Sequence, residues 1–299
     1  MLTVCMMPSV EHAADVSSGK AVSQWSGASR EQAVQRMFTA IATRYDLNNS
    51  LLSFGLHHRW KALAANLVPA RTHGRALDLG AGTGDLALLL DRRMGEHGRV
   101  VAMDLNFAML RVGVAKIARR GLASRIACFR GNAERIVFRD DTFDAVTAGF
   151  CIRNVGDRPQ AFREIYRVLK PGGRFVCLEF SRPVPAWLRR AYDWYSFHLL
   201  PAIGAWVARD HTDVYRYLPE SIRTFPDQEG LAAMLRETGF ARVDYQNLTG
   251  GIVAIHVAVK PVLSGETGVL PNPPAPPYQG GKEKAEIVNE FVNTYKDEA

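Results

Sequence analysis

A glycine-rich turn between two apolar segments restricts the fold of this chain more than any other feature of its sequence. The apolar run Ala76–Leu79 precedes the turn Gly80–Asp85, and a segment with the apolar spacing of a helix follows. A second apolar run, Val100–Met103, ends in Asp104, 24 residues after the first glycine of the turn. Strand, glycine turn, helix, strand and acidic residue in this order form the first half of a nucleotide-binding α/β sheet.

The spacing within the turn favours S-adenosylmethionine over a nicotinamide dinucleotide. Gly80, Gly82 and Gly84 make the pattern G-x-G-x-G, which lacks the third glycine of the dinucleotide pattern G-x-G-x-x-G. Asp78 and Asp85 flank the turn. Two carboxylates would repel a pyrophosphate, but they suit the amino group and the sulfonium of S-adenosylmethionine. A tight turn with incidental acidic residues and a nicotinamide site remain the alternatives.

The end of the alternating strand and helix pattern gives a second argument against a dehydrogenase. The segments Arg242–Leu248 and Ile252–Val259 are joined by a turn with two glycines, which predicts an antiparallel hairpin. The predicted fold class is therefore α/β, a Rossmann-like, mostly parallel sheet of seven strands with a terminal antiparallel hairpin, as in class I methyltransferases. Other expected elements are strands at Ile126–Arg130, Phe143–Phe150 and Arg174–Phe180, helices at Met109–Arg120, Gln160–Leu169 (ended by Pro171-Gly172-Gly173) and Gln228–Thr238, and a helical stretch Arg30–Leu67 broken at Leu47–Ser50.

Composition shifts divide the chain into three parts. Residues 1–30 are polar and aperiodic, and we expect a disordered extension. Residues 31–261 form the predicted methyltransferase domain. Within it, residues 31–70 are expected to form a helical substrate cap, and residues 182–225 an aromatic insertion too long for a plain connection. Residues 262–299 are interpreted as a proline-rich linker and a charged tail.

The charge and the cysteine content limit which partners and which cellular compartment are expected. The net charge of +7 divides into −3 from Val262 onward and +10 before it, which suggests an anionic surface or partner. No nucleic-acid-binding motif accompanies this charge, so nucleic acid is not expected.

Four cysteines without C-x-x-C or metal-ligand spacing predict a reducing compartment, no disulfide and no metal site. No apolar run reaches the ~18 residues of a membrane span, so an integral membrane protein is not expected.

Two segments resemble signatures of the ubiquinone/menaquinone biosynthesis C-methyltransferases. They are Tyr45–Trp60, which reads YDLNNSLLSFGLHHRW, and Arg167–Ser181, which reads RVLKPGGRFVCLEFS. Leu47 stands where the family usually has Met, and Gly149 where some members have Ser. Segments Phe150–Val155, Tyr192–His198 and Tyr215–Arg223 are also similar, so that the resemblance covers about Val34 to Lys260.

This resemblance implies a reaction and a donor site. The reaction is C-methylation of a polyprenylated hydroquinone, demethylmenaquinol and/or 2-polyprenyl-6-methoxy-1,4-benzoquinol, with S-adenosylmethionine as the methyl donor. A methyltransferase of another lipid or phenol, and a non-catalytic organiser of a quinone-synthesis complex, are the alternatives. The residues expected to bind the donor are Gly80, Gly82 and Thr83 at its methionine part, Asp104 at the ribose, and Asn132 and Ala133 at the adenine.

Arg153 and Asn154 are the predicted catalytic residues. Methylating a ring carbon requires loss of the proton of the neighbouring hydroxyl, so a group that stabilises a phenolate is needed. Both residues follow the expected strand Phe143–Phe150, at the sheet edge where the methyl group would be presented. We expect Arg153 to stabilise the phenolate and Asn154 to orient the ring. A structural ion pair is the alternative for Arg153, and Tyr45 and His198 are secondary candidates.

The predicted partners follow from this chemistry. A polyprenyl tail needs an apolar groove, for which the aromatic insertion with Trp194 and Trp206 and the segment Leu51–Phe54 are candidates; core packing would also explain them. We expect a polyprenyl quinol substrate and a cytoplasmic location with peripheral contact to an anionic inner membrane, on the matrix side in a eukaryote. A homodimer or a quinone-synthesis complex is a further expectation.

Overall fold

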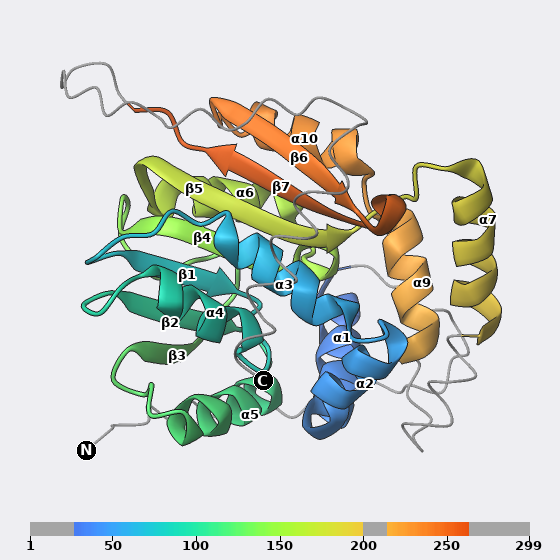
Figure 1. The fold of residues 1–299 in the computed structure, drawn as a ribbon, viewed down its shortest axis with the longest axis horizontal. Helices are drawn as coiled ribbons and strands as arrows, with labels where there is room; N and C mark the ends of the chain where they lie inside the picture. The colour runs from blue at the N-terminus through green and yellow to red at the C-terminus, as the bar shows by residue number, and fades with distance from the viewer. Residues whose placement is uncertain (1–26, 200–213, 263–299) are drawn as a thin grey trace, which may run out of the picture. The chain divides into compact units, whose positions relative to one another are not determined.

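A single seven-stranded sheet is the centre of the computed structural model, which describes residues 27–199 and 214–262 (Figure 1). The strand order is β3-β2-β1-β4-β5-β7-β6; β3 to β5 in this order are parallel, and β7 is antiparallel to β5 and β6. The predicted fold class is confirmed. The strands are β1 (Arg75–Leu79), β2 (Arg99–Asp104), β3 (Ile126–Arg130), β4 (Phe143–Gly149), β5 (Leu169–Phe180), β6 (Arg242–Leu248) and β7 (Val253–Val259).

Two apolar cores lie on opposite faces of the sheet, because neighbouring residues of a strand point to opposite sides. Ala76 belongs to the core shared with α3, α4 and α5, whereas Leu77 belongs to the core shared with α6 and α10. Ala145 and Val146 divide in the same way. These helices are α3 (Leu56–Asn66), α4 (Asp85–Arg93), α5 (Phe107–Arg119), α6 (Arg158–Val168) and α10 (Gln228–Glu237).

Additional helices lie beyond the carboxyl ends of the parallel strands, where Figure 1 shows α1, α2, α7 and α9. Helix α1 begins at Gly27, inside the range 1–30 expected to be disordered. The rest of that extension, Trp206 and the tail from Leu263 lie outside the described residues. The additional helices are α1 (Gly27–Ile41), η2 (Ala42–Arg44), α2 (Tyr45–Leu52), α7 (Ala186–Trp194), the π-helix η4 (Tyr195–Leu199) and α9 (Val214–Thr224).

The predicted helix break at Leu47–Ser50 is wrong, because α2 continues through these residues. The polar side chains that suggested a turn are accommodated within the helix. Asn48 is buried, and the Ser50 hydroxyl donates to the Asp46 carbonyl at 2.9 Å. The chain turns instead after α2, where Phe54 and Gly55 have φ values of 50° and 77°.

The Pro-Gly-Gly segment also differs from expectation. Helix α6 ends at Val168, and β5 begins at Leu169, so Pro171-Gly172-Gly173 lies within a strand. Gly172 has φ 74°, and the pairing with β4 shifts register between Phe143 and Ala145. The segment is therefore an irregularity in β5, because glycine permits the positive φ that such a bulge requires.

Candidate active site

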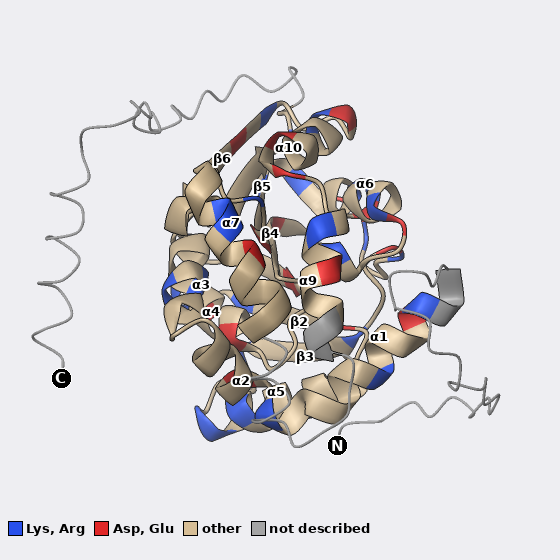
Figure 2. Cartoon of the chain, turned by 90° about the vertical axis from the view of Figure 1, so that its right-hand side faces the viewer, with Lys and Arg blue, Asp and Glu red and all other residues tan. Residues whose placement is uncertain are grey.

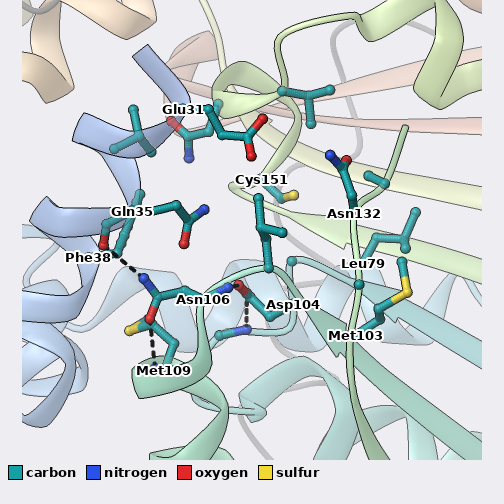
Figure 3. Close-up of a pocket in the computed structure, with 18 of the residues that line it drawn as sticks. Glu31, Gln35, Phe38, Leu79, Met103, Asp104, Asn106, Met109, Asn132 and Cys151 are labelled. Atoms are coloured by element: carbon teal, nitrogen blue, oxygen red, sulfur yellow. Dashed lines mark hydrogen bonds between the residues drawn. The ribbon is translucent and has the colours of Figure 1, made fainter. Parts of the chain in front are cut away.

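A pocket opens where β1, β2, β3 and β4 end, and we call it the glycine-loop pocket (Figure 3). Carboxyl ends of parallel strands meet at one edge of a sheet, so residues far apart in sequence come together there. Six of the predicted site residues line this pocket: Gly80, Gly82, Asp104, Asn132, Ala133 and Asn154. The remaining lining residues are Tyr45, Leu79, Met103, Leu105, Asn106, Met109, Gly131, Glu134, Gly149, Phe150, Cys151, Val155, Gly156 and four residues of α1.

The turn after β1 needs its glycines. Gly80, Gly82 and Gly84 have φ values of 62°, 55° and 81°, a region that other residues rarely adopt. A Cβ on Gly80 would also lie 2.2 Å from the Cys151 sulfur. The turn therefore packs closely against Cys151 in the loop after β4. The backbone of Gly80 and Gly82 lines the pocket.

Asp104 connects the end of β2 to this turn. One carboxylate oxygen accepts from the Gly82 N–H at 2.8 Å, and the other from the Asn106 N–H at 2.7 Å. Burial raises the pKa of Asp104, although these backbone hydrogen bonds oppose the shift. Each carboxylate oxygen has a further lone pair, so the group retains the capacity to accept from two vicinal hydroxyls. This arrangement fits the ribose of S-adenosylmethionine.

Asn132 and Ala133 follow β3 on the opposite wall. The Asn132 side-chain oxygen accepts from the Glu134 N–H at 2.8 Å, so the loop-turn role considered for this residue is present. Figure 3 shows its amide end directed into the pocket. The residue therefore has both a turn role and a surface to offer a ligand.

Thr83 and the two flanking acidic residues have other partners. The Thr83 hydroxyl is buried and donates to Asp46 at 2.6 Å, outside the pocket wall. Lys61 and Lys116 contact Asp85 at 2.9 and 2.7 Å and hold its pKa well below the ordinary value despite its burial. The expectation that Asp85 serves a cationic ligand stays a prediction: two lysines contact its carboxylate, and it is not among the residues that line the glycine-loop pocket.

Asp78 lies beneath the turn. It is 1% exposed and accepts a 2.7 Å hydrogen bond from the Thr147 hydroxyl. Burial raises its pKa to about 7. Asp78 belongs to β1 and is not among the residues that line the pocket.

Helix α1 forms a wall that the sequence patterns did not reveal. Its residues Glu31, Val34, Gln35 and Phe38 line the pocket. Asn106 holds the helix in place, because its side chain donates to the Gln35 carbonyl at 2.9 Å and to the Thr39 hydroxyl at 3.0 Å. The same residue caps α5 by accepting from the Met109 N–H. The only sequence signal was an N-cap residue directly after β2.

A second pocket, the helical pocket, lies among the additional helices. It shares Tyr45 and Phe150 with the glycine-loop pocket, so the two adjoin. Most of its wall is apolar or aromatic, with a few polar groups. The remaining lining residues are Asn49, Leu52, Ser53, His57, Trp60, Lys61, Arg153, Phe180, Tyr192 and Leu218.

The two predicted catalytic residues face different pockets. They belong to the short 3-10 helix η3 (Ile152–Asn154), which follows β4. Arg153 lines the helical pocket, whereas Asn154 lines the glycine-loop pocket and accepts from the Tyr217 hydroxyl at 3.0 Å. The pair therefore lies at the junction where a donor and an acceptor would meet.

Arg153 takes part in a buried ion pair. It is 4% exposed, and its guanidinium lies 2.6 Å from Glu179, which is 1% exposed. Burial alone would lower the pKa of Arg153, but Glu179 raises it above the ordinary value. Among the described residues its Nε has no hydrogen-bond partner. The structural ion pair considered for Arg153 thus exists, and one donor of the guanidinium is still unused.

His198, a secondary candidate, and His57 have different surroundings. His57 is buried, its Nδ1 lies 2.9 Å from the Ser53 hydroxyl, and burial lowers its pKa to about 4. His198 is exposed, and its Nδ1 lies 3.1 Å from the Trp194 carbonyl. Only His57 lines a pocket, so His198 is not brought to either site.

Comparisons with known proteins agree on one family. Residues 27–260 match the model of the ubiE/COQ5 methyltransferase family. The ubiquinone/menaquinone biosynthesis C-methyltransferase UbiE of Vibrio vulnificus is 49% identical over 227 residues, which are 76% of this chain and 87% of that protein. The UbiE of Proteus mirabilis is 47% identical over 231 residues, 77% of this chain and 92% of that protein.

Solved structures of low sequence identity share the fold. The [4+2]-cyclase SpnF is 18% identical, with a TM-score of 0.57 over 78% of this chain and 96% of SpnF. A SAM-dependent methyltransferase of Thermotoga maritima is also 18% identical, with a TM-score of 0.55 over 76% of this chain and 99% of that one. Since one of these proteins is a cyclase, the fold alone does not define the reaction.

Proposed function

The chain belongs to the ubiE/COQ5 methyltransferase family, and we propose that it methylates a ring carbon of a polyprenylated hydroquinone. The acceptor is demethylmenaquinol and/or 2-polyprenyl-6-methoxy-1,4-benzoquinol, and the donor is S-adenosylmethionine. The observation that carries this proposal is the meeting of a pocket of mixed polar and apolar lining and a largely apolar pocket at Tyr45 and Phe150. A transferase for a polar donor and a lipid acceptor needs such a junction.

The residues of the glycine-loop pocket are proposed to hold the donor. Asp104 would accept from the ribose hydroxyls, and Asn132 with Ala133 would contact the adenine. The backbone of Gly80 and Gly82 would approach the methionine part. Thr83 would act indirectly, through the hydrogen bond to Asp46 that fixes the turn. When bound, the donor supplies an electrophilic methyl group on its sulfonium.

Arg153 and Asn154 are proposed to prepare the acceptor. A hydroquinone hydroxyl gives up its proton, and the ring carbon beside it then attacks the methyl group. The carbon–methyl bond forms as the methyl–sulfur bond breaks, which leaves S-adenosylhomocysteine. The ring carbon then loses its own proton to water and the oxygen regains one, so that one proton is released overall. The positive charge of Arg153 would stabilise the phenolate in a site largely shielded from water. Asn154, held by Tyr217, would orient the ring.

A methyl-transfer assay tests this proposal and resolves the acceptor. Purified protein is incubated with labelled S-adenosylmethionine and either demethylmenaquinol or the demethylated methoxybenzoquinol. We expect methylated product from at least one quinol. A protein that binds the donor in calorimetry but methylates neither quinol would instead be a methyltransferase of another lipid or phenol. Failure to bind the donor would support the non-catalytic organiser.

The same proposal includes a cytoplasmic location with contact to an anionic inner membrane. It also includes assembly into a homodimer or a quinone-synthesis complex. The basic charge of the chain before Val262 and a water-insoluble substrate support membrane contact. Within the described residues, no helix has the length and apolar character to cross a bilayer. Sedimentation of the purified chain would test its assembly state.

A further inference from the structure

Large apolar side chains are exposed on two segments beside the helical pocket. Phe54 is 79% exposed, Trp187 72% and Trp194 60%. Single exposed apolar residues are common on protein surfaces, but a contiguous group signals an interaction site. We call this group the apolar face. Its members are Leu47, Leu51, Phe54 and Leu56 on α2 and the start of α3, and Val184, Trp187, Trp194, Phe197 and Leu199 on or near α7 and η4.

The two segments of the apolar face meet where η4 reaches the end of α2. The Tyr195 hydroxyl donates to the Leu52 carbonyl at 2.9 Å, which joins η4 to the end of α2. Leu52, Tyr195 and Leu218 also pack together. Leu52 and Leu218 line the helical pocket, so the apolar face surrounds residues of the pocket wall.

Packing within the described chain does not account for α7. None of its nine residues is buried, although it contains two tryptophans, a tyrosine and a leucine. A helix that is stabilised by an apolar stripe on the protein core buries that stripe. Tyr192 lines the helical pocket, but Trp187 and Trp194 are exposed, as in helices that lie in a membrane interface.

Basic side chains accompany the apolar ones. Arg182, Arg189 and Arg190 are exposed on or near α7. Their acidic neighbour Asp193 lies 3.3 Å from Arg223 and is therefore already paired. Figure 2 views the side that carries α2, α7 and α9, where both basic and acidic segments lie. Tryptophan with arginine is the composition that binds the headgroup region of anionic bilayers.

We propose that the apolar face inserts into the interfacial region of an anionic phospholipid bilayer, with the helical pocket open toward the lipid. The polyprenyl tail of the acceptor could then pass from the bilayer into the pocket without crossing water. The part of this inference that concerns the tail rests on the proposed function, whereas vesicle binding itself does not.

Vesicle co-sedimentation tests the proposal. The full chain is mixed with phosphatidylcholine vesicles, with or without about 30 mol% phosphatidylglycerol. We expect binding to the anionic vesicles, and a drop of about tenfold or more in Trp187→Ala/Trp194→Ala. Arg189→Gln/Arg190→Gln should lose about tenfold on anionic vesicles. Phe129→Ala is the matched control, because Phe129 is an exposed aromatic residue on the distant edge strand β3.

Fluorescence quenching by brominated lipids gives a readout that does not depend on how the variants fold. Quenching of the wild-type tryptophan emission by anionic vesicles supports insertion. Its absence, or equal vesicle binding by wild type and Trp187→Ala/Trp194→Ala, overturns the proposal. A short-chain quinol in solution separates the two proposals: variants that lose vesicle binding should still methylate it. A wild type that binds vesicles but methylates no quinol would contradict only the proposed function.

Discussion

The glycine-loop pocket and the helical pocket adjoin at Tyr45 and Phe150, but they are built in different ways. The first is built mainly from segments that follow parallel strands, closed by α1. The second combines residues of α2, α3, α7 and α9 with residues that follow β4 and end β5. Under the proposed function, the first would hold the donor and the second the acceptor. The following predictions test how separate these two roles are.

The largest expected effect concerns Arg153, where the two pockets meet. We expect Arg153→Met to lower kcat roughly 100- to 1,000-fold, because a preorganised cation facing the phenolate would be lost. The affinity for S-adenosylmethionine in calorimetry should change little. A large loss of donor affinity with an unchanged kcat would assign Arg153 to the donor site instead.

The ion pair with Glu179 provides the control. Removing the Arg153 side chain alone leaves Glu179 buried without its counter-ion and should cost about 3–5 kcal/mol of unfolding free energy. The double variant Arg153→Met/Glu179→Gln should recover most of that stability, because neither charge remains. If Arg153 acts on the acceptor, the double variant stays inactive; if its role is structural, activity returns with stability.

Asp104 should have the next largest effect, confined to the donor side. We expect Asp104→Ala to weaken S-adenosylmethionine binding roughly 100-fold, since two charge-assisted hydrogen bonds to the ribose are lost. Calorimetry with donor alone measures this. The KM for a short-chain quinol at saturating donor should stay within a factor of about three, well below a tenfold step of 1.4 kcal/mol. A comparable rise in that KM would show that the pockets are coupled.

Because the two pockets are built in different ways, the sequence predicts one of them better than the other. Gly80, Asp104 and Asn132 each follow a strand, and the ends of parallel strands meet at one edge, so their proximity could be predicted. The position of α1 at this pocket could not be predicted. The contact between Asn106 and Gln35 spans 71 positions of sequence, and no periodicity encodes it. The partners of Asp85 were missed for the same reason, since Lys61 and Lys116 come from other helices.

The helical pocket was predicted less well. The aromatic insertion and the segment Leu51–Phe54 were expected near the acceptor, but the sequence does not distinguish a pocket wall from an outer surface. Leu52 lines the pocket, whereas Phe54, two residues later, is exposed. Phe54 and Gly55, which have positive φ, change the direction of the chain between α2 and α3. Such a turn depends on tertiary packing, which overrides local propensity.

A smaller effect is expected from pH, through Asp78 under the glycine-loop pocket. Its pKa rises from 3.8 to about 7 on folding, so its contribution to stability is complete below pH 3.8 and is lost as pH rises toward 7. Between about pH 5.5 and 7 the loss should be about 2 kcal/mol. Asp78→Asn, which can still accept from Thr147, should remove this contribution, measured as the difference in unfolding free energy between wild type and variant across this pH range. A difference that stays constant across this range would contradict the raised pKa.

The smallest effect should come from His57 in the helical pocket, with the opposite sign. Its pKa falls from 6.5 to about 4 on folding, so its contribution to stability is present above pH 6.5 and is lost as pH falls toward 4. Between about pH 6.5 and 5.5 the loss should be about 1 kcal/mol. His57→Asn keeps a donor near Ser53 and should remove this acid-side slope, while Asp78→Asn leaves it intact. If either variant changed both slopes, the two pockets would titrate as one unit, and the separation of donor and acceptor roles would fail.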